Sequence, residues 1–322
     1  MKTKDASLSR RTILGMAAGT AAIPAVGLAA PVDRGNKLQV CAFSKHFHWL
    51  SIREASELAA SIGYDGMDLT VRKDGHVEPE RVTDDLPKAV QAILASGLKA
   101  PMITAGIIDV TSPHAETILK TAAAVGIKRY RWGGFRYDTA KTIPQQIREF
   151  QAKSRDLAAM NKQYGVCAMY HTHSGPGQFG ASMWDIWSVL KDLDTNAVSV
   201  NLDIGHATVE GGLGGWINSS RLLLPISKGV AVKDFRWEKN AAGKWDARWC
   251  GLGLGMVNLP QFLSLLKVSG FDGPLQLHME YKELGDAHSG SKKSSIPKEE
   301  FVNLMKRDLT LLRGLLKQAD LG

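Results

Sequence analysis

The nine histidines of this chain are the residues whose type and placement best suit chemistry. Seven of them stand at the end of a short apolar run or just beyond it: His46, His48, His76, His171, His173, His206 and His278. Imidazole gains and loses its proton near pH 7, so a histidine can act as an acid, a base or a metal ligand. Burying so many ionisable groups unused would be costly, and the pattern therefore predicts a shared site.

Alternation within strands groups these side chains further, because residues two apart on a strand face the same way. Three pairs share a face by this rule: His171 with His173, His278 with Glu280, and Ala231 with Lys233. Asp203 follows an apolar run directly, and His206 follows a glycine at which the chain should turn. We therefore expect four strands to aim ionisable groups at one place.

The elements that must position these residues alternate from Leu38 onward between short apolar runs and amphipathic stretches, with glycine at most helix-to-strand junctions. We predict eight strands, at 38–43, 66–71, 99–104, 128–132, 166–170, 199–202, 229–232 and 275–279. The predicted helices lie at 52–62, 86–95, 112–125, 144–164 and 298–318.

Strands separated by helices require parallel pairing through right-handed crossovers, and eight such units favour a closed barrel over an open sheet. We predict a single-domain (β/α)8 TIM barrel over residues 31–322. Active sites of this fold lie at the C-terminal ends of the strands, where the histidines fall. The segment 285–297, rich in Ser, Lys and Gly, is predicted to be a mobile loop over the barrel mouth.

The first thirty residues have the features of a twin-arginine signal peptide. Arg10 and Arg11 precede an uncharged stretch, 15–30, that is rich in Ala and Gly and short for a membrane span. Small residues before Pro31 suit cleavage near Ala29 or Ala30. We therefore expect a periplasmic or secreted protein without a membrane anchor, divided into a leader at 1–30 and the barrel.

Charge and cysteine content exclude some classes of function. The formal charge is +8, of which about +5 remains without the leader, and no basic stripe with interleaved aromatic residues supports nucleic-acid binding. Cys41, Cys167 and Cys250 each lie in an apolar or glycine-rich run and form no CxxC pair. We interpret them as buried thiols and not as a disulfide framework or a zinc knuckle.

Four motifs resemble those of a known group of barrels: Asn-Leu-Asp-Ile-Gly-His at 201–206, Val-Lys-Asp at 232–234, Gly-Leu-Gly-Leu-Gly at 251–255, and Gly-Pro-Leu-Gln-Leu-His-Met-Glu-Tyr at 273–281. They resemble, in order, the LDxxH motif, the end of the HxKD motif, the LGxG loop and the last strand of the xylose-isomerase-like TIM barrel superfamily. That superfamily includes sugar isomerases, epimerases and endonuclease IV-type enzymes. The resemblance runs over nearly the whole barrel.

By this resemblance Asp203 and Glu280 would bind a divalent metal ion, and His206 would contact a substrate hydroxyl or carbonyl. The family's fifth strand usually supplies a glutamate where this chain has His171, and its seventh a histidine where this chain has Ala231. Imidazole still ligates zinc, manganese or iron, whereas alanine cannot. We expect Mn, Zn, Mg or Co on His171, Asp203 and Glu280. The alternative is a barrel without metal, in which Lys233 supplies the positive charge.

Chemistry on keto sugars needs a base beside the carbonyl and a positive centre for the enediolate. The metal or Lys233 could polarise the carbonyl, and His173, His206 or His278 could be the base. The same parts allow isomerisation, epimerisation or β-elimination from a 3-keto-glycoside. Export favours unphosphorylated sugars and glycosides as substrates.

The ends of the first two strands carry aromatic and cationic residues that suit the binding of a sugar ring. We predict a substrate-binding role for Lys45, His48, Trp49, Arg72 and His76. For Trp49 the alternative is packing against a helix. On the fourth strand Arg131 and Trp132 must point opposite ways, one into the barrel and one toward the helices.

Two other functions fit the same sequence. A sugar-binding barrel without catalysis would explain the altered residues His171 and Ala231. An abasic-site endonuclease shares some motifs, including Gly-Pro-Gly at 175–177, but export and the depleted ligand set argue against it. The partner in the leading hypothesis is a small sugar or glycoside, and a homo-oligomer is compatible with the sequence.

Overall fold

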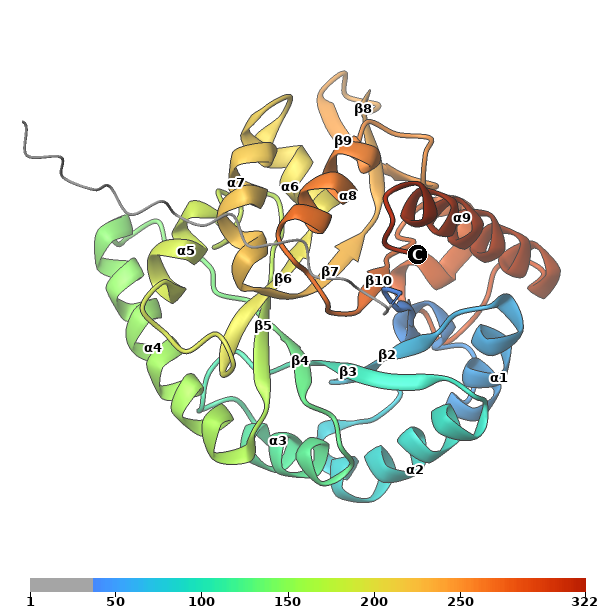
Figure 1. Ribbon diagram of the computed structural model, residues 1–322, viewed down its shortest axis with the longest axis horizontal. Helices are drawn as coiled ribbons and strands as arrows, with labels where there is room; N and C mark the ends of the chain where they lie inside the picture. Colours follow the sequence, from blue (N-terminus) through green and yellow to red (C-terminus); the bar gives the residue numbers. More distant parts are fainter. Residues whose placement is uncertain (1–36) are drawn as a thin grey trace, which may run out of the picture. The chain divides into compact units, whose positions relative to one another are not determined.

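The computed structural model describes residues 37–322, so the predicted leader and residues 31–36 lie outside it. Eight strands close into a barrel in the order β1-β10-β7-β6-β5-β4-β3-β2, and all their pairings are parallel (Figure 1). The bounds are β1 (Val40–Phe43), β2 (Gly66–Val71), β3 (Lys99–Ala105), β4 (Arg129–Trp132), β5 (Cys167–His171), β6 (Val198–Asp203), β7 (Ser227–Val232) and β10 (Leu275–Leu277). The predicted TIM barrel is confirmed.

Helices surround the barrel strands in Figure 1. They are α1 (Ile52–Ile62), α2 (Val82–Ala95), α3 (Ala115–Ala124), α4 (Ile143–Tyr164), α5 (Trp184–Leu190), α6 (Ile204–Gly211), α7 (Gly215–Leu223), α8 (Leu259–Val268) and α9 (Lys298–Gln318). Short 3₁₀ helices add η1 (Ser44–Phe47), η2 (Pro79–Arg81), η3 (Leu224–Ile226) and η4 (Lys282–Ser289). Among the described residues, no helix combines the length and apolar character needed to cross a membrane.

The predicted bounds of α1 are correct because both of its ends carry local signals. Ser51 accepts a hydrogen bond from the backbone N–H of Glu54, whose side chain accepts one in return, which makes a capping box. Gly63 ends the helix in the left-handed conformation, with φ of 108°, which glycine adopts without strain.

Strand alternation decides which side chains enter the barrel. On β4, Trp132 points outward, donates a hydrogen bond to the carbonyl of Ile108 (2.7 Å) and meets the ring of Tyr170 edge-on. Arg131 points the opposite way and contacts His173. The question that the sequence left open on this strand is therefore answered, and Arg131 belongs to the barrel interior.

An antiparallel hairpin that the sequence analysis did not anticipate follows β7. It consists of β8 (Asp234–Lys239) and β9 (Trp245–Cys250) and is separate from the barrel sheet (Figure 1). Its turn has a recognisable signal, since the side chain of Asn240 accepts hydrogen bonds from the backbone of Ala242 and Lys244. The hairpin places Trp249 beside the ends of β6 and β7.

The segment predicted as a mobile loop is instead partly helical and is held by hydrogen bonds. The carbonyls of Ala287 and Gly290 lie 3.1 Å and 3.0 Å from the Nδ1 atoms of His46 and His48. Lys292 donates to the carbonyl of Gly75 at 3.0 Å. These contacts hold the segment against the loops that follow β1 and β2, and its mobility stays a prediction.

Asp234 organises the loop that follows the hairpin. Its buried carboxylate accepts hydrogen bonds from the backbone N–H groups of Phe235, Gly253, Gly255 and Val257, at 2.8 to 3.0 Å. A Cβ at Gly255 would lie 2.2 Å from an oxygen of this carboxylate, so the loop can wrap so closely only with glycine there. The Val-Lys-Asp and Gly-Leu-Gly motifs therefore act together in the fold.

We expect Asp234→Asn to lower the free energy of unfolding by about 3 kcal/mol, because an amide replaces an ionised acceptor and turns two donors toward backbone N–H groups. Chemical denaturation would measure the change. Asp272→Asn is the matched control, since Asp272 is exposed. Equal stability of the two variants would contradict this role of Asp234.

Candidate active site

Ionisable side chains gather at the C-terminal ends of four neighbouring barrel strands, β10, β7, β6 and β5. Strands β5 and β6 end in His171 and Asp203, and Lys233 and His278 come directly after β7 and β10. All four are at most 3% exposed. These ionisable groups therefore lie together at the barrel mouth, as the sequence predicts.

Lys233 is at the centre of this group. Its Nζ atom lies 2.7 Å from Nε2 of His206, 2.8 Å from Oε2 of Glu280 and 3.2 Å from Oδ2 of Asp203. The ring of Trp249 covers the ammonium group, with Nζ 4.1 Å from the ring centre. A Cβ at residue 205 would come within 2.6 Å of the lysine side chain, which explains the glycine between Asp203 and His206.

Two lysines and two carboxylates balance one another here. Burial alone would raise the pKa of Glu280, but the ammonium groups of Lys233 and Lys45 hold it well below its usual range. Lys45 lies 2.6 Å from the other oxygen of Glu280. Burial would likewise raise the pKa of Asp203, and the ammonium group of Lys233 lowers it instead. Both carboxylates are therefore ionised.

The histidines of the cluster are held neutral. Burial lowers the pKa of His171 and His206 well below the usual value, to about 3 for His173 and to about 4 for His278. The cations Arg131 and Lys233 act in the same direction on His173. Each neutral ring keeps one nitrogen lone pair that can accept a proton or bind a metal ion.

Three ligating atoms lie at spacings that suit a metal ion. Oδ2 of Asp203 is 3.6 Å from Nε2 of His171 and 3.6 Å from Nδ1 of His278, close to the separation of about 3.4 Å between ligands at zinc distances. Within residues 37–322, no donor forms a hydrogen bond of suitable geometry with this buried oxygen, although Nζ of Lys233 lies 3.2 Å from it. A second group with similar spacing consists of His171, His173 and His206.

His171, Asp203 and His278 therefore have spacings that fit a divalent ion, and the predicted role of Glu280 as a ligand stays a prediction. Glu280 lies between two lysines and belongs to neither group of ligating atoms, whereas His278, predicted as a base, stands beside Asp203. The amide nitrogen Nδ2 of Asn201 lies 3.2 Å from Nδ1 of His171. With its oxygen turned to the ring, Asn201 would hold the proton on Nδ1 and leave Nε2 free to ligate.

The residues predicted to bind substrate separate into four places, of which the last is that of Arg72 over the ring of Phe43. Lys45 joins the central cluster through Glu280. His48 and His76 form an edge-to-face pair 4.9 Å apart beside β2, where His48 also contacts the hydroxyl of Thr70. Trp49 packs edge-on against Phe301 of α9, which is the alternative that the sequence allowed. Their role in substrate binding stays a prediction.

Arg72 lies over the ring of Phe43, with its guanidinium carbon 5.9 Å from the ring centre. The guanidinium of Arg131 lies over the same ring at 5.7 Å, and the ring of His278 stacks on it at 4.5 Å. Sequence reasoning named Arg72 but did not assign Phe43 to the site. Its position as the last residue of a buried strand was the available signal.

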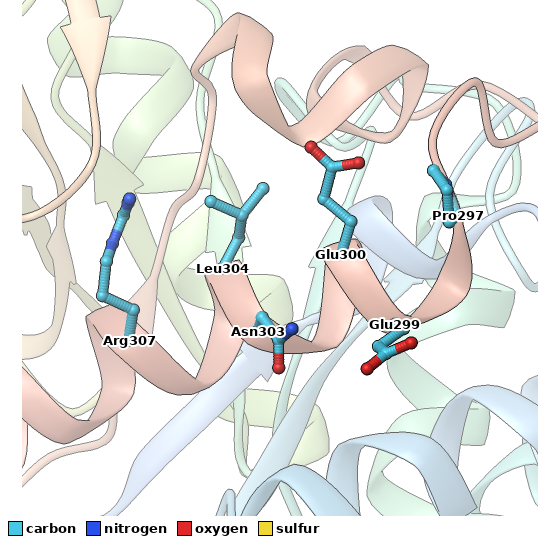
Figure 2. Close-up of a pocket in the computed structure, with 6 residues that line it drawn as sticks. All are labelled: Pro297, Glu299, Glu300, Asn303, Leu304 and Arg307. Carbon is cyan, nitrogen blue, oxygen red and sulfur yellow. The ribbon is translucent and has the colours of Figure 1, made fainter.

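A surface pocket elsewhere carries none of these groups. It lies along the start of α9, where Figure 2 shows Glu300, Leu304 and Arg307 projecting from one side of the helix. Its lining residues are Pro297, Glu299, Glu300, Asn303, Leu304 and Arg307. With no histidine and no strand-end carboxylate, this pocket has no part in the chemistry considered below.

Asp68 is a buried carboxyl on β2 whose ionisation opposes folding. Burial raises its pKa to about 6, although the hydroxyl of Thr104 and the guanidinium groups of Arg131 and Arg72 favour the charged form. Because the unfolded state loses this proton near pH 4, the protein becomes less stable as the pH rises toward 6, and the cost stays constant above that.

Asp68→Asn should therefore gain stability relative to the parent chain as the pH rises from 4 to 7.5, by about 3 kcal/mol. Urea unfolding of both proteins across this range measures the difference, with Asp272→Asn as the control whose difference should be flat. A flat difference for Asp68→Asn itself would show that its carboxyl ionises as easily in the folded protein as in the unfolded chain.

Solved structures share this fold at low sequence identity. The chain is similar to a xylose isomerase-like TIM barrel protein from Mycobacterium smegmatis in complex with magnesium, with a TM-score of 0.61, 17% identity and coverage of 84% of this chain and 98% of that one. It is similar to 3-keto-D-glucoside 4-epimerase from E. coli, with a TM-score of 0.62, 13% identity and coverage of 86% and 100%.

A third similar structure is D-allulose 3-epimerase from Methylomonas sp. in complex with D-allulose, with a TM-score of 0.63, 15% identity and coverage of 86% and 97%. No curated protein matches the sequence. The model of the family described as xylose isomerase-like TIM barrel matches residues 56–299, from α1 to the first turn of α9. This chain therefore belongs to the xylose isomerase-like TIM barrel family.

Proposed function

We propose that this protein is an exported keto-sugar isomerase, epimerase or 3-keto-glycoside lyase that removes a proton next to a carbonyl group. The observation that carries the proposal is the contact of Lys233 Nζ with Nε2 of His206 and Oε2 of Glu280 at the barrel mouth. It places a positive charge, a proton acceptor and a carboxylate within reach of one small substrate.

Lys233 and a histidine have separate roles in the proposed proton transfer. The ammonium group of Lys233 would donate a hydrogen bond to the carbonyl oxygen and stabilise the negative charge that develops there. His173 is the partly exposed histidine of the cluster and would accept the proton from carbon at Nε2 once the guanidinium group of Arg131 turns away from this atom, with His206 as the other candidate.

Two further contacts prepare this arrangement. The backbone N–H and the hydroxyl group of Ser174 lie 3.1 Å and 2.7 Å from Nδ1 of His206 and orient its ring toward Lys233. Trp249 covers the ring of His206 edge-on at 4.8 Å and helps to keep water from the lysine. A drier site strengthens each electrostatic interaction within it.

His171, Asp203 and His278 would hold a divalent metal ion, which when bound acts as a Lewis acid on the substrate oxygen. Two histidines and a carboxylate suit zinc, manganese or iron better than magnesium. Export, inferred from the arginine pair near the N-terminus, favours unphosphorylated sugars and glycosides. The names of the similar structures, two of them sugar epimerases, support this class of reaction.

A non-catalytic sugar-binding barrel is the second candidate, and Ala231 is the observation in its favour. The residue opposite Asp203 on β7 cannot ligate a metal ion. This candidate predicts saturable binding of glycosides without any product or exchange of substrate hydrogen.

The proposed reaction can be tested by exchange of substrate hydrogen in D₂O, because isomerisation, epimerisation and elimination all begin with the same proton transfer. We expect deuterium to enter ketoses or 3-keto-glycosides at the carbon next to the carbonyl, or an elimination product to form. Lys233→Met should reduce this rate by about 10² to 10³.

Lys228→Met is the matched control for this experiment, because Lys228 lies at the other end of the same strand, β7. It should leave the exchange rate unchanged. Exchange that survives in folded Lys233→Met at the parent rate, or that is absent from the parent protein on all these substrates, would contradict the proposed mechanism.

Elemental analysis tests the metal site and its ligands separately. We expect a near-stoichiometric divalent ion in the parent protein, loss of the ion in Asp203→Asn and His278→Ala, and retention in Glu280→Gln. Removal of the ion by a chelator should abolish exchange, and its return should restore it. Full activity of metal-free protein would leave Lys233 as the positive centre, whereas metal loss in Glu280→Gln would restore Glu280 as the ligand.

A further inference from the structure

Two guanidinium groups at the barrel mouth have no carboxylate partner. Arg72 follows β2 and Arg131 lies on β4, and in residues 37–322 neither forms an ion pair, although Arg131 donates to His173 at 3.2 Å. Both lie over the ring of Phe43. His278 also stacks on this ring, with planes 22° apart.

The two arginines repel each other. Burial lowers the pKa of Arg131 to about 10, and the charge of Arg72 is the next cause. Burial also lowers the pKa of Arg72. Holding two like charges close together in a partly dry site costs free energy that some attraction must offset.

The carboxylates nearby offset this cost only in part: their charges favour the charged forms of both arginines, but in residues 37–322 none of them forms an ion pair with either. Glu280 and Asp203 are engaged with Lys45 and Lys233. Asp68 lies buried on β2, and both of its carboxylate oxygens lie 2.9 Å from the hydroxyl group of Thr104, which donates to them. With Lys45 and Lys233, the two arginines make four cations against the three carboxylates, so the barrel mouth keeps a net positive charge, and Arg131 brings part of it beside His173.

We propose that Arg72 and Arg131 bind a carboxylate on the substrate, so that the substrate is a keto-sugar acid and not a neutral ketose. Planar guanidinium groups match the geometry of a carboxylate, to which each can donate two parallel hydrogen bonds. An acid held there would present the rest of its chain to His173 and the Lys233 cluster. This inference rests on the proposed function, of which it names the substrate class.

Three ketoses that differ only at C6 test the inference: D-fructose with a hydroxyl group, D-fructuronate with a carboxylate, and D-fructose 6-phosphate with a phosphate ester. Deuterium incorporation next to the ketone is measured for each. We expect kcat/KM to be at least about 100-fold higher for the acid than for the neutral sugar, as two charge-assisted contacts would allow. High salt should reduce this preference.

Arg72→Gln and Arg131→Gln should bring the ratio of acid to neutral sugar close to one, and Arg72→Lys should keep part of it. Arg148→Gln on the exposed side of α4 is the control and should keep the parent ratio. Circular dichroism and the melting temperature establish that each variant is folded. A parent ratio near one overturns the carboxylate assignment even if all three sugars exchange hydrogen.

Binding without turnover separates this inference from the proposed function. Methyl α-D-glucuronoside and methyl α-D-glucoside have no ketone, and calorimetry should detect tighter binding of the acid, weakened at least tenfold in both Arg→Gln variants. That result without any hydrogen exchange would support the carboxylate site and overturn the proposed reaction. Preference for the phosphate ester, or equal binding of the two glycosides, would overturn the carboxylate site.

Discussion

The ammonium group of Lys233 is the charge on which the rest of the site depends. It lies between Asp203 and Glu280, two carboxylates whose ionised forms would be costly in the barrel interior without it. The same charge, together with burial, keeps His206 neutral. The charge of Lys233 thus stabilises two carboxylates and lowers the pKa of one histidine. Gly205 has no side chain and therefore leaves space for the lysine side chain.

The ammonium group of Lys233 also affects how a metal ion could bind at Asp203. Oδ2 of Asp203 faces His171 and His278 but also lies 3.2 Å from Lys233, so a metal ion held by these three residues would share one carboxylate oxygen with the ammonium group. Two cations around one anion are stable only if further negative charge is near. The enediolate of a keto sugar would supply it during the reaction, and a substrate carboxylate at the arginines would balance the remainder.

The barrel delivers these groups from both sides of its mouth. Strands β5, β6, β7 and β10 bring the ionisable side chains for which we propose acid, base and ligand roles, while β2 and β4 bring the two arginines to Phe43. The β8–β9 hairpin adds Trp249 over Lys233, and η4 closes the mouth near His46 and His48. Because each group comes from a different element, the positions of the charges depend on barrel closure.

Local patterns in the sequence determined the strands, the bounds of α1 and α9, the position of the site at the strand ends and the grouping of His171 with His173. Strand alternation and helix caps act over a few residues, so they can be read without the fold. Alternation also required Arg131 and Trp132 to point apart, but only the packing of Trp132 under Ile108 and Tyr170 decided which one entered the barrel. The position of His278 beside Asp203, the contacts of segment 285–297 with His46 and His48, and the position of Trp249 over Lys233 likewise depend on tertiary structure. Beyond the last strand residue, a side chain's direction follows from the turn it enters and from the charges that other strands place around it.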